Sequence, residues 1–367
     1  MACEYDNLHW DFREIDGYNA DFNLVVSERE AGKTTAIWRK NKLTFDRGAT
    51  FLLTRQRKVS ISDIYLNDCA GVINKFIADP KKRVRFHFAK SQIEKGIVDV
   101  YASTYEKGSR PRIFFRCVAL SNKMSDMKSL YLPNCVYHVG DEFIVNTAAG
   151  EEYLDREGWR YKELINTFIR ESYNTPYRFK SYLFGNPYSR ANPYFIELGI
   201  DISKIKRGKT IVSQNGKAVL QCYEIKQELR DFILKNNPLY QFSDEYTRYA
   251  FDGLAVNDAH MIIKPKQPEG FRLLIAIRIE GKILGIYQAP FTEDNLSYWV
   301  GSIPANLSAN RPLYAMSFRD LQTFNTVLFD SYSKKILQGF KFAMSTRRVA
   351  FQNSQFGIWA EEIYTYI

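Results

Sequence analysis

The fold of this chain follows from Phe22-Asn23-Leu24-Val25-Val26-Ser27-Glu28-Arg29-Glu30-Ala31-Gly32-Lys33-Thr34-Thr35. The apolar first half predicts a buried strand, and the second half reads S-x-x-x-x-G-K-T-T at the expected start of a helix. This is the pattern of a phosphate-binding loop, or P-loop, with serine in place of the first glycine. The stretch therefore predicts an α/β protein whose first strand leads into a nucleotide site.

Each part of the predicted loop has a chemical role. Backbone N–H groups and the positive end of the helix would cradle phosphates, and Gly32 would let the chain approach them closely. The Lys33 ammonium would reach the β- and γ-phosphates, and the Thr34 hydroxyl would bind a magnesium ion. The residues expected to bind ATP are Ser27, Glu28, Arg29, Glu30, Ala31, Gly32, Lys33, Thr34 and Thr35.

Two features of the loop oppose this interpretation. Ser27 lacks the free φ angle of glycine, and the carboxylates of Glu28 and Glu30 would repel a triphosphate unless they point outward. Arg29 would offset their charge if it points inward. The alternative is a chance G-K-T-T sequence at the start of a helix.

An acidic pair follows another predicted strand, Cys135–Val139, which leads into Gly140-Asp141-Glu142. The C-terminal ends of parallel strands face the ligand in sheets of this kind. We expect Asp141 to hold magnesium through its water shell and Glu142 to polarise the attacking water. The alternative is an ordinary acidic turn. Because the loop, an intervening strand and the acidic pair occur in this order, the sequence favours an ATPase that uses ATP and Mg²⁺.

Composition places the chain among ordinary globular proteins. Its length of 367 residues predicts about two domains. The chain is 45% hydrophobic and 25% charged, and it has no uncharged apolar stretch of the roughly 20 residues that a membrane span requires, which excludes such a span. Five scattered cysteines and four dispersed histidines argue against a disulfide framework or a zinc site and favour a reducing cytoplasm. The formal charge is +10, carried almost entirely by residues 1–235, and it permits binding to a polyanion.

The pattern of apolar runs divides the chain into three parts. Residues 1–203 alternate short apolar runs with longer mixed segments, as α/β proteins do, residues 204–238 form a small linker element, and residues 239–367 form a second domain. The predicted strands of the first part are Phe22–Val26, Thr50–Leu53, Val84–Phe88, Ile97–Ala102, Ile113–Leu120, Cys135–Val139 and Phe179–Phe184. The second domain is predicted to contain a hairpin over residues 271–288 and helices over residues 318–329 and 332–342.

Taken together, these features resemble the DNA-packaging motor ATPases of the phi-twenty-nine-like small tailed phages, distant relatives of large terminases. The resemblance covers residues 23–195 and rests on the V-V-S-x-R-x-x-G-K-T loop, on Tyr131-Leu132-Pro133-Asn134 before Asp141-Glu142-Phe143-Ile144, and on Asn192-Pro193-Tyr194-Phe195. It implies an ASCE-type P-loop domain with a parallel sheet, then the linker element and an α/β, RNase H-like domain derived from a nuclease.

The resemblance also implies a function and partners. In that family a ring of ATPases moves double-stranded DNA into a viral procapsid through the portal, or connector, protein. It implies a homo-oligomeric ring, expected to be a pentamer, in the host cytoplasm and transiently docked on the procapsid. A packaging RNA and a terminal protein are further expected partners, and no membrane is involved.

Several basic residues are implied to act between neighbouring subunits of such a ring. Leu164–Arg170 matches the helix that ends in the family's arginine finger, so Arg170 is expected to reach a neighbour's γ-phosphate. The alternative is an exposed arginine that interacts with the helix dipole. Lys128 matches a second basic residue that acts across the interface, and Lys123 is close enough to compete for that role.

Three further residues are candidates for contact with the nucleotide. Asn186 follows a predicted strand and would sense the γ-phosphate, against the alternative of a plain Gly-Asn-Pro turn. Arg55 and Arg57 follow the strand that ends near Leu53 and would lie near the base or the phosphates.

The second domain is predicted to have lost nuclease activity. A two-metal nuclease needs several carboxylates at strand ends, but the strand Leu273–Ile279 contains none. Asp252, Asp258, Glu361 and Glu362 do not complete a recognisable set. The alternatives are a terminase with an active nuclease and an unrelated α+β domain.

Contact with DNA is expected to involve phosphates rather than bases, because a packaging motor must accept any sequence. The candidate basic runs are Lys81–Arg85, Lys107–Arg116 and Lys204–Lys209, each of which has a solvated surface as its alternative. A non-hydrolysing nucleic-acid-binding protein and a helicase remain rival interpretations.

Overall fold

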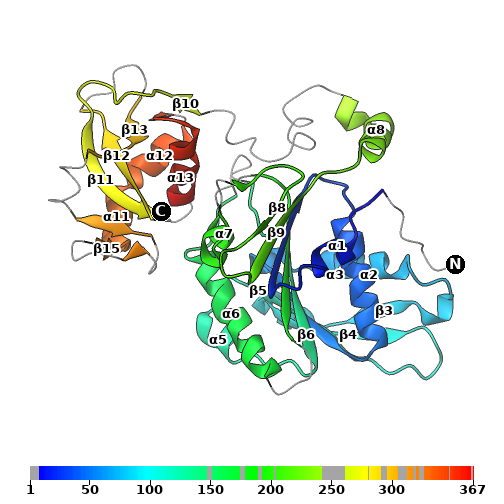
Figure 1. The fold of residues 1–367 in the computed structure, drawn as a ribbon. Helices are drawn as coiled ribbons and strands as arrows, with labels where there is room; N and C mark the ends of the chain where they lie inside the picture. The colour runs from blue at the N-terminus through cyan, green and yellow to red at the C-terminus, as the bar shows by residue number, and fades with distance from the viewer. Residues whose placement is uncertain are drawn as a thin grey trace. The chain divides into compact units, whose positions relative to one another are not determined.

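The computed structural model divides by its internal contacts into two compact units, Met1–Tyr188 with Glu197–Leu254, and Ser189–Ile196 with Ala255–Ile367 (Figure 1). The residues that the structure describes are 8–146, 151–173, 178–188, 192–201, 204–241, 261–279, 281–290, 296–304, 312–316, 320–321, 326–346, 348–364 and 367. Within them, no helix is long and apolar enough to cross a membrane.

A nine-stranded sheet in the order β3-β4-β5-β2-β6-β7-β1-β9-β8 forms the centre of the first unit. Its strands are β1 (Phe22–Ser27), β2 (Thr50–Arg55), β3 (Val84–His87), β4 (Ile97–Thr104), β5 (Arg112–Ala119), β6 (Cys135–Asp141), β7 (Lys180–Gly185), β8 (Thr210–Val212) and β9 (Ala218–Tyr223). The six strands from β5 to β9 in this order run parallel, and β3, β4 and β8 are antiparallel to their neighbours. The parallel-sheet core predicted from the sequence is confirmed.

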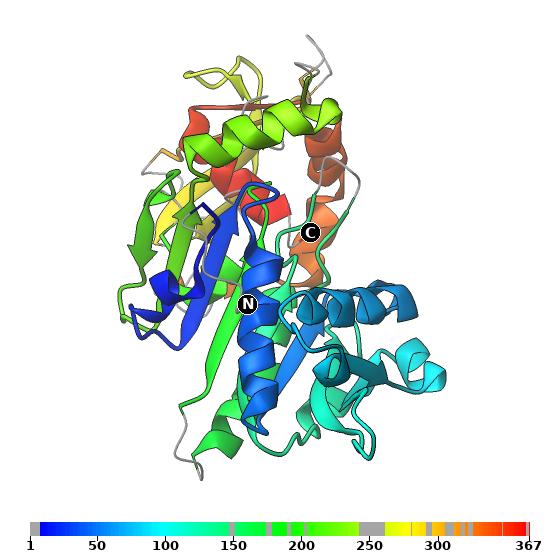
Figure 2. The same cartoon turned by 90° about the vertical axis from the view of Figure 1, so that its right-hand side faces the viewer.

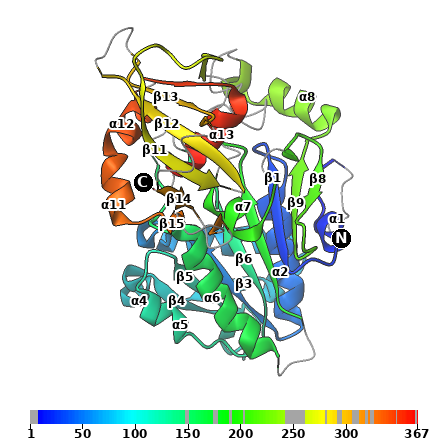
Figure 3. The same cartoon turned by 60° about the vertical axis from the view of Figure 1, so that its left-hand side comes forward.

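Helices cover both faces of this sheet. They are α1 (Phe12–Asp16), α2 (Lys33–Asp46), α3 (Asp63–Asn74), α4 (Lys90–Lys95), α5 (Met124–Lys128), α6 (Glu157–Ser172) and α8 (Gln227–Asn236), and α7 (Pro193–Leu198) has residues in both units. Helices α2 and α3 lie together on one face, and α5 and α6 lie on the other (Figures 1, 2 and 3). Because central parallel strands are covered on both sides, they read as continuous apolar runs, and residues 23–27 of β1 are all buried.

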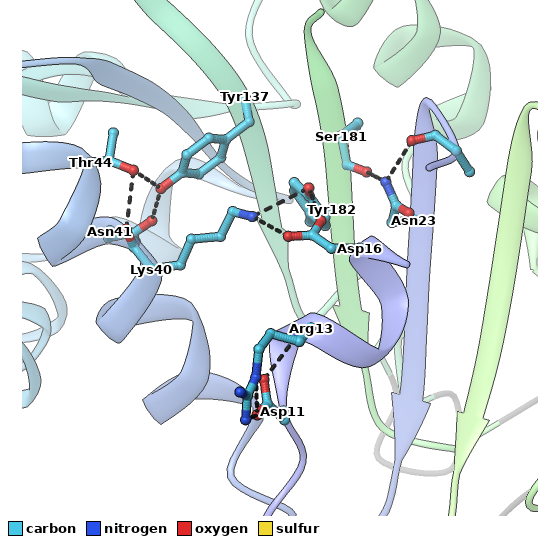
Figure 4. Close-up of polar contacts among 11 residues, drawn as sticks. Asp11, Arg13, Asp16, Asn23, Lys40, Asn41, Thr44, Tyr137, Ser181 and Tyr182 are labelled. Atoms are coloured by element: carbon cyan, nitrogen blue, oxygen red, sulfur yellow. Dashed lines mark hydrogen bonds and ion pairs between the residues drawn. The ribbon is translucent and has the colours of Figure 1, made fainter. Parts of the chain in front are cut away.

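Buried polar contacts hold α2 on the sheet (Figure 4). The Tyr137 hydroxyl of β6 donates to Asn41 Oδ1 at 2.5 Å, and Thr44 Oγ1 lies 3.0 Å from the same hydroxyl. The Lys40 ammonium donates to Asp16 Oδ2 at 2.8 Å and lies 4.2 Å from the centre of the Phe12 ring. These contacts orient the helix that begins at the predicted loop.

A second polar chain crosses the other face of the sheet. His138 of β6 is fully buried, with Nε2 2.8 Å from Thr54 Oγ1 and Nδ1 2.7 Å from Ser181 Oγ. The Ser181 hydroxyl lies 2.6 Å from the Tyr161 hydroxyl of α6. The chain joins β2, β6 and β7 to helix α6.

The segment 204–238 differs from the separate linker element that the sequence predicts. Its strand β9 pairs with β1 from Ala218 to Tyr223, and β8 pairs with β9, so both strands belong to the nine-stranded sheet. The reason is non-local, because the apolar run Ala218–Cys222 completes the buried edge beside β1. Helix α8 follows these two strands within the same segment, from Gln227 to Asn236.

The second unit contains a mixed seven-stranded sheet in the order β10-β16-β13-β12-β11-β14-β15. Its strands are β10 (Ile262–Ile263), β11 (Arg272–Ile279), β12 (Lys282–Gln288), β13 (Tyr298–Gly301), β14 (Leu313–Ala315), β15 (Thr326–Leu328) and β16 (Val349–Phe351), and its helices are α11 (Ser331–Ile336), α12 (Gln338–Ser345) and α13 (Ser354–Tyr364). Strands β11 and β12 form the predicted hairpin, with Gly281 at φ +73° in the turn.

Two helix predictions in this unit need correction. The stretch 318–329 ends in strand β15 rather than in a helix, because Thr326–Leu328 pairs in parallel with β14. Residues 318–319 and 322–325 lie outside the described residues. The stretch 332–342 is helical, but Leu337 separates α11 from α12.

Candidate nucleotide-binding site

The predicted site residues meet at one edge of the first sheet. Ser27, Arg55, Asp141 and Gly185 end four parallel strands, and the pairing of Val26 with Gly185 places the ends of β1 and β7 side by side. Strand β7 lies between β1 and β6, so Asn186 follows the strand that separates the loop from Asp141. The parallel strands therefore bring the ends of β1, β7 and β6 to one edge of the sheet.

The loop between β1 and α2 has the backbone of a close anion cradle. Gly32 has φ +88° and caps α2, and Glu30 also has positive φ, +61°. A Cβ atom at Gly32 would lie 2.9 Å from the Cβ of His9, so only glycine fits there. Ser27 is the last residue of β1, so the φ freedom of glycine is not required at that position.

A cavity of about 460 Å³ opens over this loop, which is within the range of small-ligand sites. It is lined by residues 29–36 and by His9, Trp10, Arg39, Phe76 and Asn186. Seven of the nine predicted ATP-binding residues therefore line it, and Ser27 and Glu28 do not. Thr34 and Thr35 are exposed beside the cavity.

The Lys33 ammonium lies inside the loop. It donates to the Ser27 carbonyl at 2.8 Å, to Ser27 Oγ at 2.7 Å, to the Glu28 carbonyl at 3.1 Å and to Asn186 Oδ1 at 3.2 Å. Burial lowers the pKa of Lys33 to about 7, against the opposing charges of Asp141 and Glu28, which raise it. The charge of the Asp141 carboxylate thus acts on the Lys33 ammonium, although no hydrogen bond joins them among the contacts of Lys33 given above.

The acidic side chains of the loop are turned to other partners. Glu28 Oε1 lies 2.5 Å from Arg207 Nη2, and Glu30 Oε1 accepts a hydrogen bond from Asn237 Nδ2 at 3.3 Å. Neither carboxylate is thus directed at Lys33. Arg29 lines the cavity and donates to the Tyr188 hydroxyl at 3.3 Å.

Arg55 holds both members of the acidic pair. Its Nη1 lies 3.3 Å from Asp141 Oδ2, and its Nη2 donates to Glu142 Oε2 at 2.8 Å. Burial raises the pKa of Asp141, while Arg55 and Lys33 oppose that shift. Glu142 is exposed and has positive φ, +57°, an uncommon backbone for a non-glycine residue.

Two side chains at this edge carry oxygen atoms of the kind that a magnesium ion binds. Mg²⁺ is usually held by one or two carboxylates together with substrate phosphates and waters, and Thr34 and Asp141 supply a hydroxyl and a carboxylate of that kind. No cluster of three or more His, Cys, Asp or Glu side chains that suits a metal occurs among the described residues. A magnesium ion at this edge would therefore take its remaining ligands from the phosphates of the substrate and from water.

The residues expected to act between subunits lie away from the cavity. Arg170 is exposed in the last turn of α6, Lys128 pairs with Glu163 at 2.7 Å, and Lys123 is exposed at the start of α5. Arg57 donates to the Glu152 carbonyl at 3.1 Å. The structure thus brings Asn186 and Arg55 to the site, but neither Arg170, Lys128, Lys123 nor Arg57.

Sequence reasoning missed several groups at this site. His9 and Trp10 approach the loop from the N-terminal segment, where the Trp10 amide donates to the Ala31 carbonyl at 2.9 Å. Arg39 and Phe76 form another wall of the cavity, and Arg207 partners Glu28 from 179 positions away in the chain (207 minus 28). No local motif marks these residues.

Fold and site together define an α/β protein with a parallel-sheet core and a candidate nucleotide site. Two solved structures are similar to nearly the whole chain. The Phi-28 gp11 DNA packaging motor is 16% identical, with a TM-score of 0.60, and the match covers 98% of each chain. The bacteriophage Phi-29 viral genome packaging motor assembly is 18% identical, with a TM-score of 0.52, over 98% of this chain and 99% of that one.

No protein-family model and no curated protein matches the chain. The resemblance predicted from the sequence is nonetheless confirmed for the fold, since this chain has the fold of phage DNA-packaging motor proteins.

Proposed function

We propose that this protein is an ATPase that moves double-stranded DNA into a viral procapsid. The observation that carries the proposal is the placement of the Lys33 ammonium beside a cavity of nucleotide size, with the Asp141 carboxylate close enough to raise its pKa. The likeness of fold to two packaging motors supports the choice of DNA as the partner.

Each of the candidate site residues has a separate role in the proposed hydrolysis. Residues 29–35 bind the phosphates through their N–H groups, and Lys33 compensates the charge that develops on the γ-phosphate. Thr34 and Asp141 would hold Mg²⁺, which supplies further charge compensation. The Glu142 carboxylate separates from Arg55 and then accepts a proton from the attacking water. Asn186 orients the γ-phosphate.

Arg170 would complete the site of a neighbouring copy rather than its own. Helix α6 returns the chain from the end of β6 to the beginning of β7, and these strands are parallel, so α6 runs from one edge of the sheet to the other. Its 16 residues span about 24 Å. An exposed Arg170 at the far end supports the proposal of an arginine finger that acts in trans within a ring, with a pentamer as the proposed size. Lys128 and Lys123 lie on the adjacent α5 and are proposed to assist across the same interface.

The second unit is proposed to be a nuclease-derived domain without cutting activity that contacts nucleic acid or docks the motor. Its mixed α/β architecture supports this, and Arg278 lies in β11, the strand in which no acid occurs. Of the four carboxylates considered above, Asp252 and Asp258 lie outside the described residues, and Glu361 and Glu362 belong to α13. Proposed partners are the portal protein, a packaging RNA and a terminal protein.

The test is the ATPase rate of the full chain, measured against protein concentration with and without duplex DNA. The proposal predicts magnesium-dependent turnover per subunit that rises with association and with DNA, and its loss in Lys33→Ala. Substantial turnover in Lys33→Ala would reject the loop assignment. No turnover in the unaltered chain under any condition would favour a non-hydrolysing nucleic-acid-binding protein, and metal-dependent cleavage of plasmid DNA would favour a terminase.

A further inference from the structure

A buried carboxylate belongs to the loop itself. Glu28 is 1% exposed, and its backbone carbonyl accepts a hydrogen bond from the Lys33 ammonium at 3.1 Å. The residue therefore contacts Lys33 through its backbone, although it does not line the cavity. An uncompensated negative charge there would repel a nucleotide strongly, because the screening by water is weak inside the protein.

Arg207 supplies the compensating charge. Its Nη2 lies 2.5 Å from Glu28 Oε1, and its Nε lies 3.2 Å from Glu224 Oε1. The second oxygen of Glu28 accepts a hydrogen bond from the Ile225 amide at 3.4 Å. The pairing of Ser27 with Tyr223 explains why the two carboxylates are neighbours, since Glu28 and Glu224 directly follow these paired residues.

The backbone around Arg207 is fixed to the sheet. The Gly208 amide donates to the Cys222 carbonyl at 2.8 Å, and the Cys222 amide donates to the Lys209 carbonyl at 2.9 Å. Gly208 has φ +69°, which a side chain would disfavour, and this conformation forms the turn directly after Arg207. The guanidinium is thus presented to Glu28 by an ordered turn.

Helix α8 and the residue that follows it contact the next residues of the loop; the helix is the yellow-green one in Figure 2. Asn237, directly after the helix, donates to Glu30 at 3.3 Å. Ala31 belongs to a buried apolar cluster that contains Leu229 and Ile233 of α8. Residues 28, 30 and 31 therefore all have partners in the segment 207–240.

We propose that Arg207 is a positioning residue of the nucleotide site, which acts through Glu28, and that α8 supports the same loop through Glu30 and Ala31. The ion pair neutralises the Glu28 carboxylate and keeps it away from the phosphates, while the Glu28 carbonyl stays directed at Lys33. Because linkage is reciprocal, ATP binding and the position of α8 stabilise each other. The inference rests on the proposed function.

The test compares the Kd for ATP in full-length variants, measured well below their melting temperatures so that each is folded. Arg207→Ala leaves Glu28 charged and unpaired, so it should weaken ATP binding by about tenfold or more. Glu28→Gln combined with Arg207→Ala should restore most of the affinity, because no uncompensated charge then faces the loop. Lys209→Ala is the matched control, an exposed cation of the same turn, and should bind as the unaltered chain does.

Rescue by the double variant separates positioning from a merely structural role. If Arg207→Ala does not fold, Glu28→Gln alone tests the role of the Glu28 charge. The ATP affinity of this variant should equal or exceed that of the unaltered protein. Unchanged affinity in Arg207→Ala, a weaker affinity in Glu28→Gln, or a double variant as weak as Arg207→Ala would overturn the inference. Failure of the unaltered protein to bind ATP would instead refute the proposed function itself.

Discussion

Lys33 links the local chemistry of the loop to the binding of a nucleotide. Four acceptors surround its ammonium, yet burial brings its pKa down to about 7, well below the value in water. The group is therefore poised to gain a proton when phosphates arrive. The same contacts explain why serine replaces the first glycine, since the Ser27 hydroxyl is one of the four acceptors.

This geometry predicts a pH dependence of ATP binding. Bound phosphates raise the pKa of Lys33 above its value of about 7 in the free protein, so binding takes up a proton at higher pH. The affinity should fall between pH 7.5 and 9.5, by up to about tenfold per pH unit. Calorimetry in buffers of different ionisation enthalpy counts the protons. Lys33→Arg, which stays charged, should lose the uptake, and zero uptake by the unaltered protein at pH 8.5 would contradict the argument.

At the level of elements, polar contacts fix the helices and strands that carry the site. Asn41, Thr44 and Lys40 hold α2 on β6 and α1, and His138 joins β2, β6 and β7 on the opposite face. These strands end in Arg55, Asp141 and Gly185. The ends of the strands are thus positioned by contacts made within the same strands, at Thr54, His138 and Ser181.

His138 gives a second pH prediction, this time for stability. Burial lowers its pKa to about 3, so the unfolded chain binds a proton between pH 6.5 and 3 that the folded chain does not. The stability provided by neutral His138 is therefore complete above about pH 6.5 and is lost as the pH falls. His138→Gln should be less stable at pH 7 by about 1–3 kcal/mol, and the difference should shrink toward pH 4.

Thermal unfolding at pH 7 and pH 4.5 measures this effect. His87→Gln is the control, because His87 is exposed on the edge strand β3, and a surface change of this kind should alter stability at pH 7 by less than about 0.5 kcal/mol. A His138→Gln deficit that is as large at pH 4.5 as at pH 7 would show that protonation of His138 does not contribute.

The sequence predicted the local part of this architecture well. Apolar runs predict the seven strands β1 to β7, and the order of the loop and the acidic pair places both at the C-terminal ends of parallel strands. Periodicity did not reveal that Ala218–Tyr223 pairs with β1, or that Thr326–Leu328 forms a strand, because both depend on partners distant in the chain. For the same reason the sequence predicts a basic run at Lys204–Lys209 but not the pairing of Arg207 with Glu28.

At the scale of the whole molecule, the proposed function requires more than one copy. If Arg170 is the arginine finger proposed above, it must act on a neighbouring copy, because α6 runs away from the edge of the sheet at which the loop lies. The formal charge of +10 favours association of the assembly with DNA. This electrostatic contribution to the DNA affinity weakens as the salt concentration rises.

Mixing two inactive variants tests the division of the site between copies. Arg170→Ala should lose about 10³–10⁵ in turnover, and Lys33→Ala should be inactive. A mixture of equal amounts should regain activity, because about a quarter of the interfaces then pair an intact loop with an intact finger. The steady-state ATPase rate after subunit exchange is the readout. A mixture as inactive as its components, despite exchange, would assign Arg170 a role within its own chain.

The magnesium dependence of ATP affinity in Asp141→Asn shows whether the loop and Asp141 share one ligand. Titration of ATP with Mg²⁺ and with a chelator should show tighter binding with the metal in the unaltered protein. In Asp141→Asn, metal-free binding should persist while the advantage of Mg²⁺ is largely lost, and Lys33→Ala should be weak under both conditions. An Asp141→Asn variant that keeps the full magnesium effect, or an unaltered protein that binds no ATP, would contradict the account.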